Sequence, residues 1–189
     1  MTDHFKNDPW IIVDRLADVI LAAVDGCVVD IGIGYSTEVL LRHSRKMKRS
    51  HYSVDISGRR CDWAKSHELS HDLHVVKKEK STMFGASFEE PIAILFLDGN
   101  HKAWYVKKEL EIFLGKVSDG GVTFMHDTCP LEGYFEKKQA KGKAMDTYTV
   151  RQELESRSDL NVFTWPYTAA NCGLTMVMKK IFHAPHYRV

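Results

Sequence analysis

The stretch that decides the fold reads Cys27-Val28-Val29-Asp30-Ile31-Gly32-Ile33-Gly34. Its short apolar run is typical of a buried strand, and the glycine pair allows a sharp turn and the close approach of a ligand. Asp30 stands two residues before the first glycine, where a carboxylate would repel a phosphate but attract an ammonium group. A pyrophosphate-binding loop would place its third glycine at position 37, which is Thr37. The loop therefore favours a nucleoside with a positively charged amino-acid end over a dinucleotide.

The same order of apolar run, turn and helical pattern recurs along the rest of the chain. It predicts an α/β fold with a mostly parallel sheet, because consecutive parallel strands need a long, usually helical connection. Only a short loop separates the last two predicted strands, so we expect an antiparallel hairpin at one edge of the sheet. The predicted strands cover 27–31, 51–56, 74–77, 92–97, 122–125, 160–165 and 174–178, and the predicted helices cover 10–24, 36–43, 59–69, 104–114 and 143–156.

The composition fits one domain. The 189 residues are 44% hydrophobic and carry a formal net charge of +1, which gives no general attraction to nucleic acid or to acidic membranes. No apolar stretch approaches the roughly 18 residues of a membrane-spanning helix, and the polar N-terminus lacks the apolar core of a signal peptide. We therefore expect a cytoplasmic protein with four free cysteines. We divide its single domain into an N-terminal helix (1–25), a core (26–180) and a tail (181–189).

Polar residues follow the predicted strands at their carboxyl ends, which is the edge where open parallel sheets bind ligands. Asp55 ends the second strand, and its carboxylate can accept hydrogen bonds from both hydroxyls of a ribose; the alternative is that Asp55 caps the next helix. Such an acid serves NAD and adenosyl cofactors alike, so Asp55 does not discriminate between them. The other polar residues after these strands are Asn100, His101, His126, Asp98 and Asp127.

Three motifs resemble those of class I S-adenosylmethionine-dependent methyltransferases: Val29-Asp30-Ile31-Gly32-Ile33-Gly34, Val54-Asp55, and Phe96-Leu97-Asp98-Gly99-Asn100-His101. The stretch from Leu95 through Thr128 is most similar to methyltransferase family 24 and to sugar and macrolide O-methyltransferases. The resemblance covers residues 24–180 and implies a Rossmann-like, seven-stranded sheet with helices on both faces and a reversed last strand. It also implies that S-adenosylmethionine binds at Asp30, Gly32, Gly34, Ser36, Asp55, Ile56, Ser81 and Asp98.

The residues expected to bind the adenine depart from the family pattern. After the third strand the family usually has Gly-Asp-Ser, whose acid contacts the adenine amine, whereas this chain has Glu79-Lys80-Ser81. Ser81 or a backbone amide then remains to bind the base, with Ile56, Met83 or Phe84 packing on its faces.

His101 is the candidate general base, because the unperturbed pKa of histidine, about 6.5, suits proton removal near neutral pH. In the sugar methyltransferases that the chain resembles, the histidine of Asp-x-x-His has this role; the alternatives are that His101 caps a helix or lies on the surface. Relatives also bind a metal at the ends of these strands, which makes Asp98, His126 and Asp127 a candidate Mg²⁺ site. His126 weakens that interpretation, since Mg²⁺ prefers oxygen ligands. In the competing interpretation Asp98 holds the methionine end of the cofactor or a substrate hydroxyl.

The leading hypothesis is S-adenosylmethionine-dependent O-methylation of a small polar molecule. One alternative is a non-catalytic adenosyl-binding module or degenerate enzyme. Another is an NAD(P)-dependent oxidoreductase, which Asp30 and the terminal hairpin disfavour. We expect neither nucleic acid nor a membrane as a partner, because runs of charged residues more often form solvated faces than binding surfaces. A second subunit of a homo-oligomer could complete the acceptor site.

Overall fold

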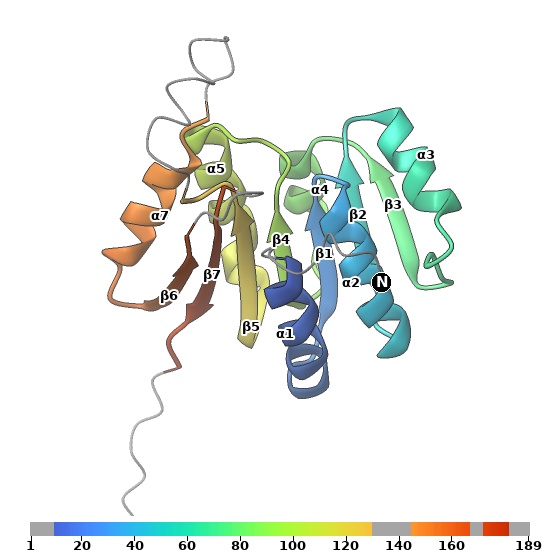
Figure 1. Ribbon diagram of the computed structural model, residues 1–189, viewed down its shortest axis with the longest axis horizontal. Helices are drawn as coiled ribbons and strands as arrows, with labels where there is room; N and C mark the ends of the chain where they lie inside the picture. The colour runs from blue at the N-terminus through green and yellow to red at the C-terminus, as the bar shows by residue number, and fades with distance from the viewer. Residues whose placement is uncertain (1–9, 130–144, 167–171, 182–189) are drawn as a thin grey trace, which may run out of the picture.

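The computed structural model describes residues 10–129, 145–166 and 172–181, and within them a seven-stranded sheet lies between two layers of helices (Figure 1). The order of the strands is β3-β2-β1-β4-β5-β7-β6. The strands are β1 (Cys27–Ile31), β2 (His51–Asp55), β3 (His74–Lys78), β4 (Ile92–Leu97), β5 (Val117–His126), β6 (Leu160–Trp165) and β7 (Leu174–Lys179).

The helices divide between the two faces of the sheet. The first three in the chain pack on one face and the last three pack on the other (Figure 1). They are α1 (Trp10–Ala23), α2 (Tyr35–Lys46) and α3 (Gly58–Ser66) on the first face, and α4 (Ser81–Ser87), α5 (Ala103–Phe113) and α7 (Thr147–Glu155) on the second.

Strand direction confirms the Rossmann-like fold that the sequence predicts. β1 pairs in parallel with both β2 and β4, whereas β7 is antiparallel to β5 and β6. From β1 the chain runs outward to β3 and then returns to β4 on the other side of β1. Ligands of open α/β sheets bind beyond the carboxyl ends of the strands at such a reversal.

Large buried side chains attach each helical layer to the sheet. On the first face Trp10 of α1 packs over Phe96 of β4, with ring centroids 5.5 Å apart. On the second face Phe113 of α5 is fully buried and packs against Phe84 of α4 at 6.2 Å. Burying each such aromatic side chain stabilises the fold by about 1.5–3 kcal/mol. These contacts fix the helices to the sheet whose strand ends carry the polar residues.

Several element bounds differ from the predicted ones. The second helix begins at Tyr35, before the predicted caps Ser36 and Thr37, because the Thr37 hydroxyl accepts a hydrogen bond from the amide of Gly34 inside the first turn. The short helix α4 is not predicted by the sequence pattern. The Gly120-Gly121 pair lies inside β5, where the pairing with β4 shifts register, rather than before the strand. Residues 1–9 and the predicted tail from 182 lie outside the described residues.

Within those described residues, the helices are all too short or too polar to cross a bilayer.

Candidate active site

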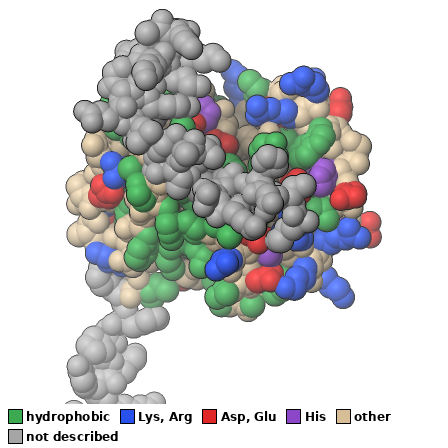
Figure 2. Space-filling model, viewed as in Figure 1, with side chains coloured by type: hydrophobic (Ala, Val, Ile, Leu, Met, Phe, Trp, Pro, Cys, Tyr) green, Lys and Arg blue, Asp and Glu red, His purple; other side chains and the backbone are tan. Residues whose placement is uncertain are grey.

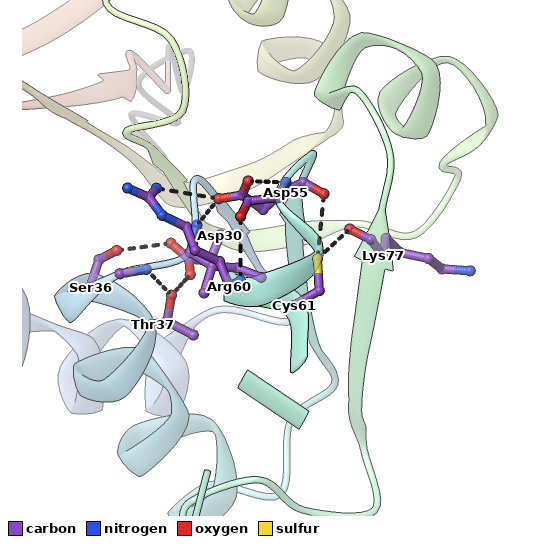
Figure 3. Close-up of polar contacts among 10 residues, drawn as sticks. Asp30, Ser36, Thr37, Asp55, Arg60, Cys61 and Lys77 are labelled. Atoms are coloured by element: carbon purple, nitrogen blue, oxygen red, sulfur yellow. Dashed lines mark hydrogen bonds and ion pairs between the residues drawn. The ribbon is translucent and has the colours of Figure 1, made fainter. Parts of the chain in front are cut away.

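The loop after β1 holds Asp30 entirely inside the protein. Its carboxylate accepts hydrogen bonds from the hydroxyls of Ser36, at 3.1 Å, and of Thr37 (Figure 3). Burial raises the pKa of Asp30 to about 7; the two hydroxyls lower the pKa, and the charges of Asp98 and Asp55 raise it further. The predicted residues Asp30 and Ser36 therefore bind one another, and a cation brought close to the loop would stabilise the ionised carboxylate.

The two glycines of this loop are needed for different reasons. Gly32 has a φ of +93°, and a Cβ there would lie 2.5 Å from the carbonyl carbon and oxygen of Asp98. Only glycine therefore lets the end of β1 contact the end of β4. A Cβ on Gly34 would meet nothing within 4 Å, so that side of the loop is open to a ligand.

Asp55 connects the ends of β1 and β2. Its Oδ2 accepts a hydrogen bond from the amide of Ile33 at 3.0 Å, and its Oδ1 accepts one from the amide of Ser57 at 2.7 Å. Arg60 lies 3.4 Å from Oδ2 on its exposed side (Figure 3). The cap of α3 is Ser57 rather than Asp55. A carboxylate has about four acceptor positions, of which the two amides and Arg60 occupy three; one stays available for a ribose hydroxyl, and displacement of the exposed Arg60 would free a second.

A cavity of about 400 Å³ opens beside Asp55. It extends from the loops after β1 and β2 to the segment after β4 and to the facing sides of α4 and α5. Its lining includes Gly32, Asp55, Ile56, Ser81, Asn100 and Glu109. The structure therefore brings four of the predicted cofactor residues to one cavity and adds Glu109, which the sequence analysis did not identify.

Four polar side chains meet at the carboxyl ends of β4 and β5. His101 Nδ1 lies 3.0 Å from Asp127 Oδ2, and His126 Nδ1 lies 3.0 Å from Asp98 Oδ1 and 3.5 Å from Asp127 Oδ1. The ring of His126 also packs against Trp10, with centroids 4.8 Å apart. The residues that the sequence predicts for catalysis and for a metal are thus adjacent, and each histidine has an acidic partner.

The backbone of His101 is fixed by the segment that precedes α7. Its carbonyl accepts hydrogen bonds from the amide of Asp146 and from the hydroxyl of Thr147, both at 3.0 Å. The Asp146 carboxylate in turn accepts a hydrogen bond from the amide of Ala103 in the first turn of α5. Asp146 rather than His101 therefore caps that turn. The sequence contains only a general signal for these contacts, an Asp-Thr pair near the start of a helical pattern.

Asp127 has a backbone conformation that is uncommon for a residue with a side chain. Its φ is +56°, in the left-handed region that asparagine and aspartate tolerate best. This conformation costs free energy and persists only where neighbouring contacts impose it. Thr128, the next residue, is fully buried and accepts a hydrogen bond from the hydroxyl of Thr175 in β7. The neighbouring strand thus anchors the turn that presents Asp127 to His101.

The same edge contains one group that could hold a metal ion. Ligand atoms of Asp98, His101 and Asp127 all lie within 4.8 Å of one another. His101 therefore occupies the place that the sequence analysis gave to His126. One imidazole and two carboxylates form a donor set that suits Mn²⁺ or Zn²⁺ better than Mg²⁺, which prefers oxygen ligands alone.

A larger cavity, of about 470 Å³, lies between α5, α7 and β6. Four of its charged side chains pair with one another, Lys107 with Glu153 and Arg157 with Asp159. Such ion pairs on a solvated surface contribute little to stability, and they do not indicate a reactive site. The cleft beyond β1, β2 and β4 is therefore the stronger candidate for the site.

Solved methyltransferases have the same fold. An O-methyltransferase of tomaymycin synthesis from Streptomyces achromogenes, solved with S-adenosylmethionine, is 15% identical with a TM-score of 0.67, covering 90% of this chain and 78% of its own. A Bacillus cereus O-methyltransferase, solved with S-adenosylhomocysteine, is 15% identical with a TM-score of 0.64, covering 90% and 80%. An rRNA methylase from Streptococcus thermophilus is 13% identical with a TM-score of 0.65, covering 93% and 98%. No curated protein matches the chain significantly.

The family itself is identified from the sequence. The model of a methyltransferase domain, Methyltransf_24, matches residues 29–128, which is more than half of the chain and extends from β1 to the residue after Asp127. That segment contains the glycine loop, Asp55, and both strand ends that carry histidine and aspartate. This chain belongs to methyltransferase family 24 and is a class I S-adenosylmethionine-dependent methyltransferase.

Proposed function

We propose that this methyltransferase transfers the methyl group to a hydroxyl oxygen of a small polar molecule. The observation that carries the proposal is the contact of 3.0 Å between His101 Nδ1 and Asp127 Oδ2. A histidine held by a carboxylate through one ring nitrogen presents its other nitrogen as a base. A hydroxyl acceptor must lose its proton during methyl transfer, so it is the acceptor that needs such a base.

The cavity supports the placement of S-adenosylmethionine. Asp55 would accept the hydroxyls of the ribose, Ile56 would pack on the adenine, and the open side of Gly34 leaves room for the methionine end. The carboxylate of Asp98 is partly exposed at the adjacent strand end, where it can attract the ammonium group. Asp30 would act from beneath the loop, through its charge rather than by contact.

When bound, S-adenosylmethionine supplies a methyl group on a positively charged sulfur. The acceptor oxygen would attack the methyl carbon in line with the carbon–sulfur bond, which breaks and leaves its electron pair on sulfur. His101 would take the acceptor proton on Nε2, while Asp127 holds the imidazole in position and stabilises its positive charge. His126, whose Nδ1 lies 3.0 Å from Asp98 Oδ1, would line the acceptor side and orient the hydroxyl.

A metal-assisted transfer is the second candidate, because Asp98, His101 and Asp127 bring their ligand atoms within 4.8 Å. A divalent ion at that place would lower the pKa of an acceptor hydroxyl bound to it. In that case His101 would be a ligand and not a base. The two candidate mechanisms use the same side chains, so substitutions alone do not separate them. Only the metal-assisted mechanism requires added metal, and that requirement distinguishes the two.

The charge distribution favours a small acceptor over RNA. Lys and Arg side chains on the visible face are interspersed with Asp and Glu (Figure 2). Two basic side chains of α2 are paired with acids of α1, Arg42 with Asp14 and Lys46 with Asp18. A nucleic-acid surface needs unpaired cations along the phosphates. Methyl transfer to RNA, suggested by the name of the rRNA methylase of similar fold, is therefore an alternative outcome of the test.

The test is a methyl-transfer assay with labelled S-adenosylmethionine and a panel of hydroxylated small molecules, with ribosomal RNA as a separate arm. We expect methyl transfer to a small molecule, and we expect this activity to persist after the enzyme has been treated with a chelator. His101→Ala should lower turnover about 100-fold or more while leaving the calorimetric affinity for S-adenosylhomocysteine unchanged. Loss of activity on chelation, with recovery on adding Mn²⁺, would support the metal-assisted version. Cofactor binding without transfer to any acceptor would support a non-catalytic module.

A further inference from the structure

Glu109 is a buried acid that the methyl-transfer chemistry above does not use. It lies on α5, is 1% exposed, and lines the same cavity as Asp55. Its Oε1 accepts a hydrogen bond from the hydroxyl of Ser81, which lies 3.2 Å from the hydroxyl of Tyr105. Its Oε2 is buried and has no hydrogen-bond partner among the residues that the structure describes. A buried acceptor without a partner costs about 1–3 kcal/mol, so its position calls for a donor.

The surroundings of Glu109 indicate what that donor should be. Burial raises the pKa of Glu109 to about 7, and the hydrogen bond from Ser81 lowers it only in part. No cation of the described residues contributes to this shift, so among them the ionised carboxylate has no charge partner. A ligand N–H group would satisfy Oε2 and stabilise the charged form.

We propose that Glu109, supported by Ser81, binds the exocyclic amine of the cofactor's adenine and thereby selects adenine over other bases. This inference rests on the proposed placement of the ribose at Asp55. The base would then extend along the cavity toward α4 and α5, where Ser81 and Glu109 lie. The 6-amino group is the hydrogen-bond donor on the edge of adenine, and Oε2 is the acceptor without a partner.

Glu79 is the competing carboxylate, because it follows β3 and also lines the cavity. It is half-buried, so water can satisfy its oxygens without a ligand. Lys80, which follows it, is exposed. The unpartnered oxygen therefore favours Glu109, and a test must compare the two acids directly.

The test compares two ligands by calorimetry: S-adenosylhomocysteine, and the analogue whose purine has hydrogen in place of the 6-amino group. We expect the wild-type chain to bind the first about 10- to 100-fold more tightly, the range for a hydrogen bond to a charged group. Glu109→Gln, which removes the charge but keeps one oxygen acceptor, should lower that ratio. Glu109→Leu, which has no acceptor, should bring the ratio close to one without lowering the melting temperature, since it removes a buried carboxyl. Glu111→Gln, at an exposed position of the same helix, is the matched control and should keep the wild-type ratio.

The outcomes separate this inference from the proposed function. A wild-type ratio near one, or a ratio unchanged in both Glu109 variants, would overturn the role of Glu109 while leaving cofactor binding intact. A ratio that collapses in Glu79→Gln instead would assign the amine to Glu79. If the wild-type chain does not bind S-adenosylhomocysteine, the proposed cofactor site fails and this inference fails with it.

Discussion

Two groups of histidines lie at opposite edges of the same sheet, and their partners differ in kind. At the carboxyl ends of the strands, His101 and His126 each contact an aspartate. At the amino ends of β2 and β3, His51 and His74 are hydrogen-bonded to serine hydroxyls instead. These four rings thus have acids as partners at one edge and neutral groups at the other. The hydrogen-bond partner of a histidine and the edge of the sheet at which it lies therefore indicate whether it is a candidate for catalysis. The residue type alone does not.

The distal histidine group (His51, His71 and His74) is built as an uncharged network. Ser44 Oγ lies 3.0 Å from His51 Nδ1 and 3.1 Å from His71 Nε2. Burial lowers the pKa of all three histidines, that of His51 well below its usual value and that of His74 to about 4. Neighbouring histidines lower the pKa values of His51 and His74 further. These rings are therefore neutral at physiological pH and serve packing, whereas the site group faces carboxylates.

The largest effect should come from removing the negative charge beside His101. Asp127→Asn keeps the size of the side chain and tolerates the positive φ, so the fold should persist. Turnover should fall about 100-fold or more, because the amide neither orients the imidazole correctly nor stabilises its positive charge. The measurement is methyl transfer to the acceptor that the panel identifies. His74→Gln is the control at the other edge and should stay within twofold of the wild type; a loss below threefold in Asp127→Asn would contradict the role of the pair.

The next effect concerns affinity rather than rate. Asp55→Ala should weaken binding of S-adenosylhomocysteine about 10- to 100-fold, the range for hydrogen bonds to a charged group. Asp55→Asn keeps one oxygen acceptor and should lose less. Both variants should also be less stable, because the amides of Ile33 and Ser57 lose a charged acceptor. Calorimetry on the folded fraction measures the change, and equal affinity in Asp55→Ala would remove the ribose assignment.

The contrast between the two edges also shows what the sequence could predict. The buried runs of β1 and β4 have the predicted bounds, because continuous apolar segments leave few alternatives. The strand ends then determine which polar residues meet, so the adjacency of Asp98, His101 and Asp127 follows from the topology. The partner of each histidine does not follow, because the left-handed turn at Asp127 directs its carboxylate toward His101.

Other parts of the site depend on contacts between distant segments. Helix α4 is seven residues long and contains Gly85, which gives it a weak helical pattern. Glu109 lies among core residues of an amphipathic helix, and a sequence cannot show that its neighbour across the cavity is Ser81. The support that Asp146 and Thr147 give to His101 joins residues more than 40 positions apart. Local patterns carry no signal for such pairs.

The distal histidine group should contribute stability that is lost in acid. Unfolded histidines bind protons below about pH 6.5, whereas His74 in the folded chain resists protonation until about pH 4. At this residue the unfolded state therefore gains its proton first, and the contribution of His74 to the free energy of unfolding should fall as the pH drops from 6.5 to 4. His74 alone should contribute on the order of 2 kcal/mol, after allowance for its partial exposure. Urea titrations of the wild type and of His74→Gln measure this difference.

The comparison above pH 7 is the internal control for that experiment. There the histidine is neutral in both states, so the difference between the two chains should not change with pH. If His74→Gln loses stability in acid as steeply as the wild type does, other groups cause the acid sensitivity.

The smallest effect should come from the hydroxyl that joins two of the distal rings. Ser44→Ala removes the partner of His51 Nδ1 and of His71 Nε2, and Ser44 is fully buried, so water cannot easily replace it. The free energy of unfolding should fall by about 1–2 kcal/mol, and turnover and cofactor affinity should stay within twofold of the wild type. Urea unfolding and the methyl-transfer assay, run on the same preparation, measure both quantities. Because Ser44 lies at the edge opposite the site, a large loss of turnover in a folded variant would mean that the two edges are coupled, and the division between a structural and a chemical histidine group would then be wrong.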